Sequence, residues 1–162
     1  GVFWVTNAAM SIQGVLCKPL TWHNDQRGSL AELVRADDPA LMAAPIGQVY
    51  VTTLYPGVVK AWHRHSHQWD RMSCLKGRVM LGLIDDRVDS PTYGAQMSFI
   101  LGDRSFNLVM FPPGIWHGLK NIGEEEALVV NVVSAPYDRE RPDEERAPAH
   151  GVLSFDWSRR DS

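Results

Sequence analysis

Two stretches decide the fold: GVVKAWHRHSHQWDRMSCLKG, from Gly57 to Gly77, and PPGIWHGLKN, from Pro112 to Asn121. Together they hold four of the six histidines in the chain, His63, His65, His67 and His117. Side chains at positions i and i+2 of a strand point to the same face, so His63 and His65 are expected to share one. His117, on a strand across a small barrel, can converge on that face. The chemistry of the protein is therefore expected here.

The rest of the chain consists of short β-segments separated by turn residues. Segments that recur about every 8–12 residues are typical of an all-β sandwich or barrel. A double-sheet jelly roll is predicted, because two of about ten short strands carry histidines that face each other. One helical turn is expected at Asp37–Ala43, capped by Asp37 or Asp38. The expected strands are 14–20, 29–34, 47–54, 60–65, 70–75, 78–84, 96–101, 106–111, 116–119 and 127–134.

A length of 162 residues predicts a single domain. Residues 1–13 are expected to form an N-terminal extension or edge strand, and residues 137–162 a tail that packs on the barrel. The charged run Asp138–Arg146 is expected to be solvated surface.

Composition excludes several classes of partner. The net charge is −3 and there is no long basic run, so no nucleic-acid partner is expected. No apolar stretch reaches the roughly 20 residues needed to span a bilayer. The first nine residues lack the basic region of a signal peptide. The two distant cysteines suit a reducing compartment, so we expect a cytoplasmic protein without a membrane partner.

The spacings of the two quoted stretches resemble the two motifs of the cupin fold, with Asp70 where glutamate is usual. Over residues 14–157 the chain further resembles the dTDP-4-dehydrorhamnose 3,5-epimerase group of nucleotide-sugar isomerases. The matching segments are DQRGSLAE from Asp25, GVVKAWH from Gly57, DDRVDSPTYG from Asp85, and PPGIWHG from Pro112.

The resemblance implies a reaction and a set of site residues. The substrate would be a dTDP-linked 4-keto-6-deoxysugar, used in making a polysaccharide or another deoxysugar product. His63 would be the base that removes the proton next to the ketone, without a cofactor. An imidazole is suited to this role near neutral pH, and His65 or His117 could handle the second proton. The residues implied to bind the nucleotide and diphosphate are Arg27, Glu32, Gln48, Lys60 and Tyr137.

The chain also departs from that group. Asp70 stands where the epimerases have a lysine, and Asn131 falls where they have a tyrosine acid. The carboxylate that partners their histidine comes from a C-terminal segment, and this chain ends soon after Trp157. The His-x-His pair is closer to the sugar 3,4-ketoisomerases. A related isomerisation is therefore expected rather than the standard double epimerisation.

Two alternatives remain open at this point. His63, His65, Asp70 and His117 could instead hold one divalent Fe, Mn, Ni or Zn ion, because three imidazoles and a carboxylate suit a first-row metal. A non-catalytic sugar-binding cupin is the other alternative. In either case a homodimer is expected, because jelly rolls leave edge strands that need covering.

Overall fold

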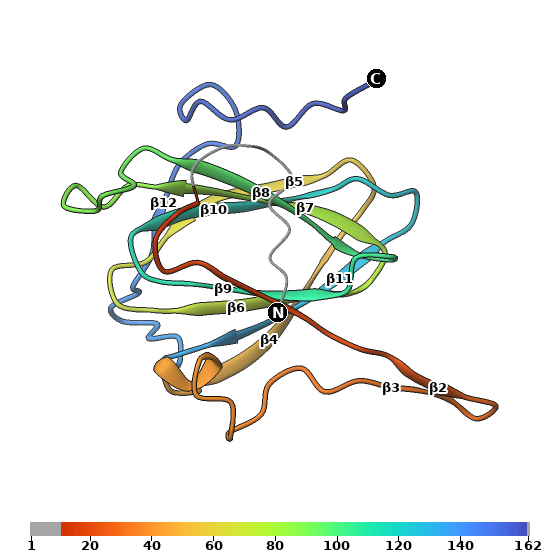
Figure 1. Ribbon diagram of the computed structural model, residues 1–162. Helices are drawn as coiled ribbons and strands as arrows, with labels where there is room; N and C mark the ends of the chain where they lie inside the picture. Colours follow the sequence, from red (N-terminus) through yellow and green to blue (C-terminus); the bar gives the residue numbers. More distant parts are fainter. Residues whose placement is uncertain (1–10, 162) are drawn as a thin grey trace.

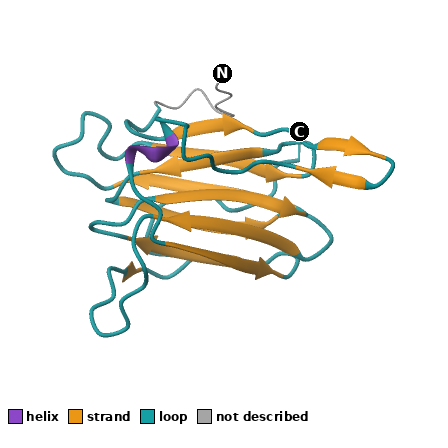
Figure 2. Cartoon of the chain, turned by 90° about the horizontal axis from the view of Figure 1, so that it is seen from below, coloured by secondary structure: helices purple, strands orange, loops and turns teal. Residues whose placement is uncertain are grey.

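The computed structural model describes residues 11–161, and these form two facing antiparallel sheets (Figures 1 and 2). The first sheet has the strand order β1-β9-β6-β11-β4 and the second β12-β5-β10-β7-β8. The predicted double-sheet jelly roll is confirmed. The elements are β1 Leu16–Pro19, β2 His23–Asp25, β3 Gly28–Leu30, the 3₁₀ turn Leu41–Ala43, β4 Gln48–Leu54, β5 Val59–Arg64, β6 Asp70–Lys76, β7 Arg78–Asp85, β8 Gln96–Gly102, β9 Asn107–Phe111, β10 Ile115–Asn121, β11 Ala127–Val133 and β12 Glu145–Arg146.

Three local expectations need correction. The strand expected at 29–34 is only Gly28–Leu30, which pairs with His23–Asp25 in a hairpin that stands out from the body (Figure 1). The helical turn shrinks to Leu41–Ala43, with Asp38 accepting hydrogen bonds from the amides of Ala40 and Leu41. β12 lies in the charged tail, where no strand was expected.

The barrel interior is apolar along most of its length. On β7 the alternate residues Val79, Leu81 and Leu83 are fully buried, as the period of two along a strand requires. Four other strands place polar residues on the inward face, among them Tyr50 on β4, Asp70 on β6, His117 on β10 and Asn131 on β11. These polar residues belong to the candidate site described below.

The outer face of the second sheet is also covered. Trp62 and Trp116, which alternate with the histidines, pack outside the barrel with Trp157 and Phe155 of the C-terminal segment. Trp62 is fully buried there. His63, the next residue, faces inward toward His117. Within residues 11–161 there is no helix of the length and hydropathy that crossing a bilayer requires.

Candidate active site

The antiparallel pairing of β5 with β10 sets the position of two histidines. His63 and His117 are direct partners across the two strands, and their ring centroids lie 6.0 Å apart. The register shifts at a bulge immediately after His117, a device that re-aims side chains near active sites. The expectation that these distant histidines converge is thus met by the geometry.

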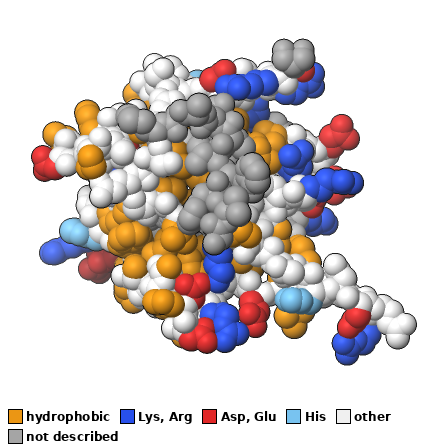
Figure 3. Space-filling view, in the orientation of Figure 1, with side chains coloured by type: hydrophobic (Ala, Val, Ile, Leu, Met, Phe, Trp, Pro, Cys, Tyr) orange, Lys and Arg blue, Asp and Glu red, His pale blue; other side chains and the backbone are white. Residues whose placement is uncertain are grey.

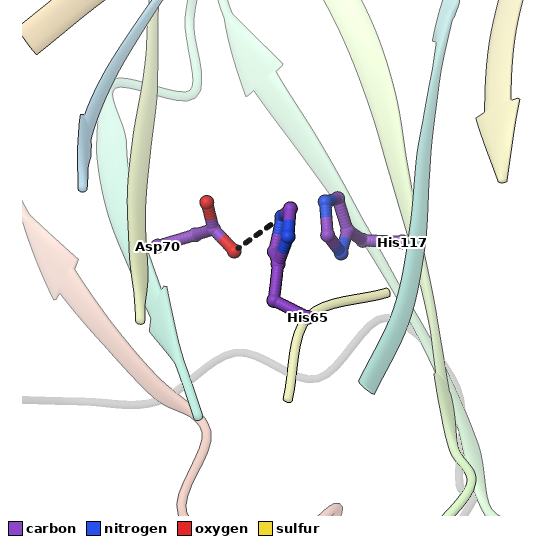
Figure 4. A group of neighbouring side chains, drawn as sticks. All are labelled: His65, Asp70 and His117. Atoms are coloured by element: carbon purple, nitrogen blue, oxygen red, sulfur yellow. Dashed lines mark ion pairs between the residues drawn. The ribbon is translucent and has the colours of Figure 1, made fainter. Parts of the chain in front are cut away.

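His65 lies just past the end of β5, between His117 and Asp70 (Figure 4). Its ring centroid is 5.0 Å from that of His117, and its Nε2 is 3.6 Å from Oδ2 of Asp70. The Nδ1 of His65 lies 2.6 Å from the carbonyl oxygen of Asp143. A carbonyl oxygen only accepts, so Nδ1 carries a proton and Nε2 faces the carboxylate.

Asp70 is almost fully buried, and its two oxygens differ. Oδ1 accepts hydrogen bonds from the side-chain amides of Gln68, at 3.0 Å, and Asn131, at 2.9 Å. Oδ2 has no hydrogen-bond partner among the residues that the structure describes. A buried polar atom without a hydrogen bond is costly, and Oδ2 faces the ring of His65, whose Nε2 is 3.6 Å away.

A carboxylate from the tail reaches His63. The Oε1 of Glu144 lies 2.7 Å from Nδ1 of His63, and Glu144 is held in turn by Arg146 at 3.0 Å. This overturns two expectations, since the histidine does have a C-terminal carboxylate partner and the run Asp138–Arg146 is not simply solvated surface. The side chain of Glu144 is only 18% exposed.

Backbone pairing explains how the tail reaches the site. β12 pairs with β5, with Glu145 opposite Arg64, and Ala147 exchanges backbone hydrogen bonds with Trp62. Just before β12, the carboxylate of Asp143 accepts hydrogen bonds from the amides of residues 66–68. The tail is therefore attached on both sides of Glu144. The sequence signal for this attachment is Pro142, which interrupts the charged run Asp138–Arg146 just before Asp143 and Glu144.

Burial and hydrogen bonding set the protonation of two groups in the site, His117 and Glu144. It lowers the pKa of His117 to about 4, so this imidazole is neutral at physiological pH. Burial alone would raise the pKa of Glu144, but hydrogen bonds from Arg146 and His63 outweigh it and place the pKa below its usual range. Glu144 is thus an anion that faces His63.

A pocket of about 440 Å³ opens beside these groups. Its lining includes His65, Glu144, Gln48, Tyr50 and Tyr137, whereas His63 and His117 are not among the lining residues. The backbone amide of Tyr137 donates a hydrogen bond to the side-chain oxygen of Gln48, at 2.7 Å. Two of the five residues implied to bind substrate therefore lie together at the pocket.

The other three lie elsewhere on this chain. Arg27, between β2 and β3, is 86% exposed in its side chain and pairs with Asp25. The hairpin that carries it projects from the body of the chain (Figures 1 and 3). Glu32, also exposed, pairs with Arg35. Lys60 donates hydrogen bonds to the Thr52 hydroxyl and the Thr53 carbonyl of β4. None of the three lines the pocket of its own chain.

The segment DDRVDSPTYG has a structural role. Asp85, fully shielded in its side chain, accepts hydrogen bonds from Arg87, Ser90 and Thr92. Burial would raise the pKa of Asp85, but these bonds hold it far below its usual value. The segment thus closes the loop between β7 and β8.

Within residues 11–161, one group of side chains has the spacing of metal ligands. Ligand atoms of His65, Asp70 and His117 all lie within 4.8 Å of one another. His63, the fourth residue of the metal set considered from the sequence, is not in this cluster, and its Nδ1 lies 2.7 Å from Oε1 of Glu144.

Comparisons with known proteins identify the family of the chain. The family described as dTDP-4-dehydrorhamnose 3,5-epimerase matches residues 9–161. A probable low-salt glycan biosynthesis epimerase, Agl13 of Haloferax volcanii, is 41% identical, over 91% of this chain and 96% of its own length. The spore coat polysaccharide biosynthesis protein SpsL of Bacillus subtilis is 35% identical, over 91% and 97%.

Among solved structures, a dTDP sugar isomerase from Desulfovibrio desulfuricans G20 superposes with a TM-score of 0.84 at 29% identity, covering 93% of this chain and 94% of its own. The cupin-type fold expected from the motif spacings is thereby confirmed. The chain belongs to the dTDP-4-dehydrorhamnose 3,5-epimerase family of sugar-nucleotide epimerases.

Proposed function

We propose that this protein isomerises a dTDP-linked 4-keto-6-deoxysugar in the biosynthesis of a polysaccharide or glycan, with His63 as the general base. The observation that carries the proposal is the pair formed by His63 and Glu144, whose atoms lie 2.7 Å apart. The anionic oxygen of Glu144 holds a proton on Nδ1 of His63. The lone pair of Nε2 is then free to take the proton next to the ketone.

The second imidazole has the opposite role. The Nε2 of His65 lies 3.6 Å from Oδ2 of Asp70, and its Nδ1 is held by the carbonyl of Asp143. This ring is assigned to stabilising the enolate oxygen that develops when the carbon loses its proton. His117, neutral and buried, packs against His65 on its other side (Figure 4). His63 and His65 thus serve the two halves of the reaction.

Substitution of the base tests this proposal. His63→Asn, assayed in deuterated water with dTDP-4-keto-6-deoxyglucose, should lose exchange of the proton next to the ketone by about 10²–10⁴-fold while the protein stays folded. His150→Asn, in the exposed tail, is the matched control. Wild-type exchange by His63→Asn would refute the assignment of the base.

A second candidate is a metal-dependent enzyme of the same fold, favoured by the cluster of His65, Asp70 and His117 and by the unpartnered Oδ2 of Asp70. Two imidazoles and a carboxylate fit a divalent first-row ion, which would polarise the carbonyl as a Lewis acid. Elemental analysis of protein purified without added metal or chelator separates the candidates. Stoichiometric metal that disappears in Asp70→Asn would favour this one, whereas a metal-free wild type that exchanges deuterium would exclude it.

We further propose a homodimer that brings Arg27 and Glu32 to a second copy. The β2–β3 hairpin extends away from the body of its own chain (Figure 2). β4 is an edge strand whose outward Val49 and Val51 are each 58% exposed. Edge strands of this kind favour pairing with another chain. The N-terminal strand expected to take part lies outside the described residues.

A further inference from the structure

The side chain of Tyr50 faces the histidines from the opposite sheet. β4, which carries it, belongs to the first sheet, whereas β5 and β10, which carry His63 and His117, belong to the second. Tyr50 lines the same pocket as His65 and Glu144, and it remains 40% exposed there. A substrate in this pocket would therefore have the imidazole of His65 on one side and the phenol of Tyr50 on the other, while Glu144 joins the pocket lining to His63.

The hydroxyl of Tyr50 is fixed by a side chain of the neighbouring strand. Asn131 is the direct partner of Tyr50 across β11 and β4, and its Nδ2 lies 2.9 Å from the phenolic oxygen. The same Nδ2 donates to Oδ1 of Asp70, and the Oδ1 of Asn131 accepts from the backbone amide of Arg71 at 3.1 Å. If the side-chain amide of Asn131 were flipped, its oxygen would face the Asp70 carboxylate and its NH₂ group would face the backbone N–H of Arg71. Neither contact can be a hydrogen bond, so the orientation of the amide is determined.

This orientation decides where the hydroxyl proton points. Both hydrogens of the Asn131 amide are used as donors, so the oxygen of Tyr50 is an acceptor in that bond. No other partner of the Tyr50 hydroxyl is found among residues 11–161. Its own hydrogen is therefore free to be donated to a molecule in the pocket.

We propose that Tyr50 is the proton donor that completes the inversion of the substrate carbon. This inference rests on the proposed function. Inversion requires that a proton leave one face of the planar enolate and that another arrive from the opposite face, and the two sheets supply these groups from opposite sides. His63 alone can only return a proton to the face from which it took one.

The protons balance with His63, Tyr50 and solvent alone. His63 takes the proton from the carbon, and the electrons of that bond form the enolate. The enolate carbon then takes the proton of the Tyr50 hydroxyl, which leaves a phenolate that accepts a hydrogen bond from Asn131. Solvent restores the proton of Tyr50 and removes that of His63.

The surroundings of Tyr50 suit this role. Burial, followed by the charge of Asp70, raises its pKa to about 12. The phenol thus stays protonated at neutral pH, yet it is still far more acidic than the C–H bond next to a ketone, so transfer to the enolate carbon is downhill.

The test uses the whole protein and follows two events on dTDP-4-keto-6-deoxyglucose in deuterated water. Nuclear magnetic resonance measures two products. Deuterium that enters with retention of configuration at the carbon needs only His63, whereas the sugar with inverted configuration needs both His63 and Tyr50. For Tyr50→Phe we expect exchange with retention to persist while inversion falls by about 10²–10⁴-fold. Tyr55→Phe, an exposed residue just after β4, is the matched control.

Three outcomes would overturn the inference. Inversion by Tyr50→Phe at the wild-type rate would show that another group donates the proton. An equal fall of exchange and inversion would assign Tyr50 to positioning the substrate. A wild type that neither exchanges nor inverts would overturn the proposed function together with the role of Tyr50, whereas the first two outcomes leave the proposed function intact.

Discussion

Replacement of Glu144 tests how the tail controls the base. Its Oε1 faces Nδ1 of His63 at 2.7 Å, and its Oε2 accepts a hydrogen bond from Arg146 at 3.0 Å. In Glu144→Ala both contacts are lost. In Glu144→Gln the amide oxygen is drawn to Arg146, because a guanidinium only donates. The NH₂ group then donates to Nδ1 of His63 and forces the proton onto Nε2, where the lone pair is needed.

The two variants should therefore differ in size of effect. A hydrogen bond to a charged group contributes about 1.5–3 kcal/mol, which is about 10- to 150-fold in rate at 1.36 kcal/mol per tenfold. That is the loss expected for Glu144→Ala. Glu144→Gln should lose more, about 10⁴-fold, because the wrong tautomer removes the base; a loss of this size is known for the asparagine variant of a serine protease triad.

The assay is deuterium exchange next to the ketone of dTDP-4-keto-6-deoxyglucose, with Glu145→Gln as the neighbouring control on the exposed pair with Arg64. Adding Arg146→Ala to Glu144→Gln should restore part of the activity, because the amide is then free to turn its oxygen toward His63. Equal losses in the alanine and glutamine variants would refute the tautomer argument. Wild-type exchange in both would refute any role of Glu144.

Three further predictions concern pH, nucleotide binding and assembly. Because the pKa of His117 is lowered to about 4 in the folded state and lies near 6.5 when unfolded, its contribution to stability is present above about pH 6.5 and is lost as the pH falls toward 4. Denaturant unfolding should show a decrease of up to about 3 kcal/mol over that window, and His117→Gln should show a smaller decrease. Arg27→Ala should weaken dTDP binding by about 10- to 150-fold in calorimetry, with kcat little changed because such a contact acts equally in ground and transition states; unchanged binding would leave Arg27 as a partner of Asp25 only. Val51→Lys should convert a dimer to a monomer in sedimentation, since a lysine on an edge strand opposes pairing, and a wild type that is already monomeric would contradict the proposed assembly.

Most of the fold could be predicted because its signals are local. Nine of the ten expected strands appear within about two residues of the observed bounds, as alternation of side chains and turn residues mark them. The strand predicted at 29–34 was the exception. The hairpin there has strands of three residues with exposed side chains, so its sequence shows no alternation of buried and exposed positions. The strand Glu145–Arg146 was not predicted for a similar reason, because two residues are too few to show the alternation of side chains along a strand.

The sequence by itself determined the strand pattern, the position of the two histidine segments and the family, because each depends on spacing within a few residues. Tertiary structure alone decided which groups complete the site. Glu144 meets His63, and Asn131 meets Tyr50, each across 81 residues of chain. Both contacts arise from strand pairing, β12 on β5 and β11 on β4. A local pattern tells which face a side chain occupies, but only the register between strands determines which distant side chain lies opposite it.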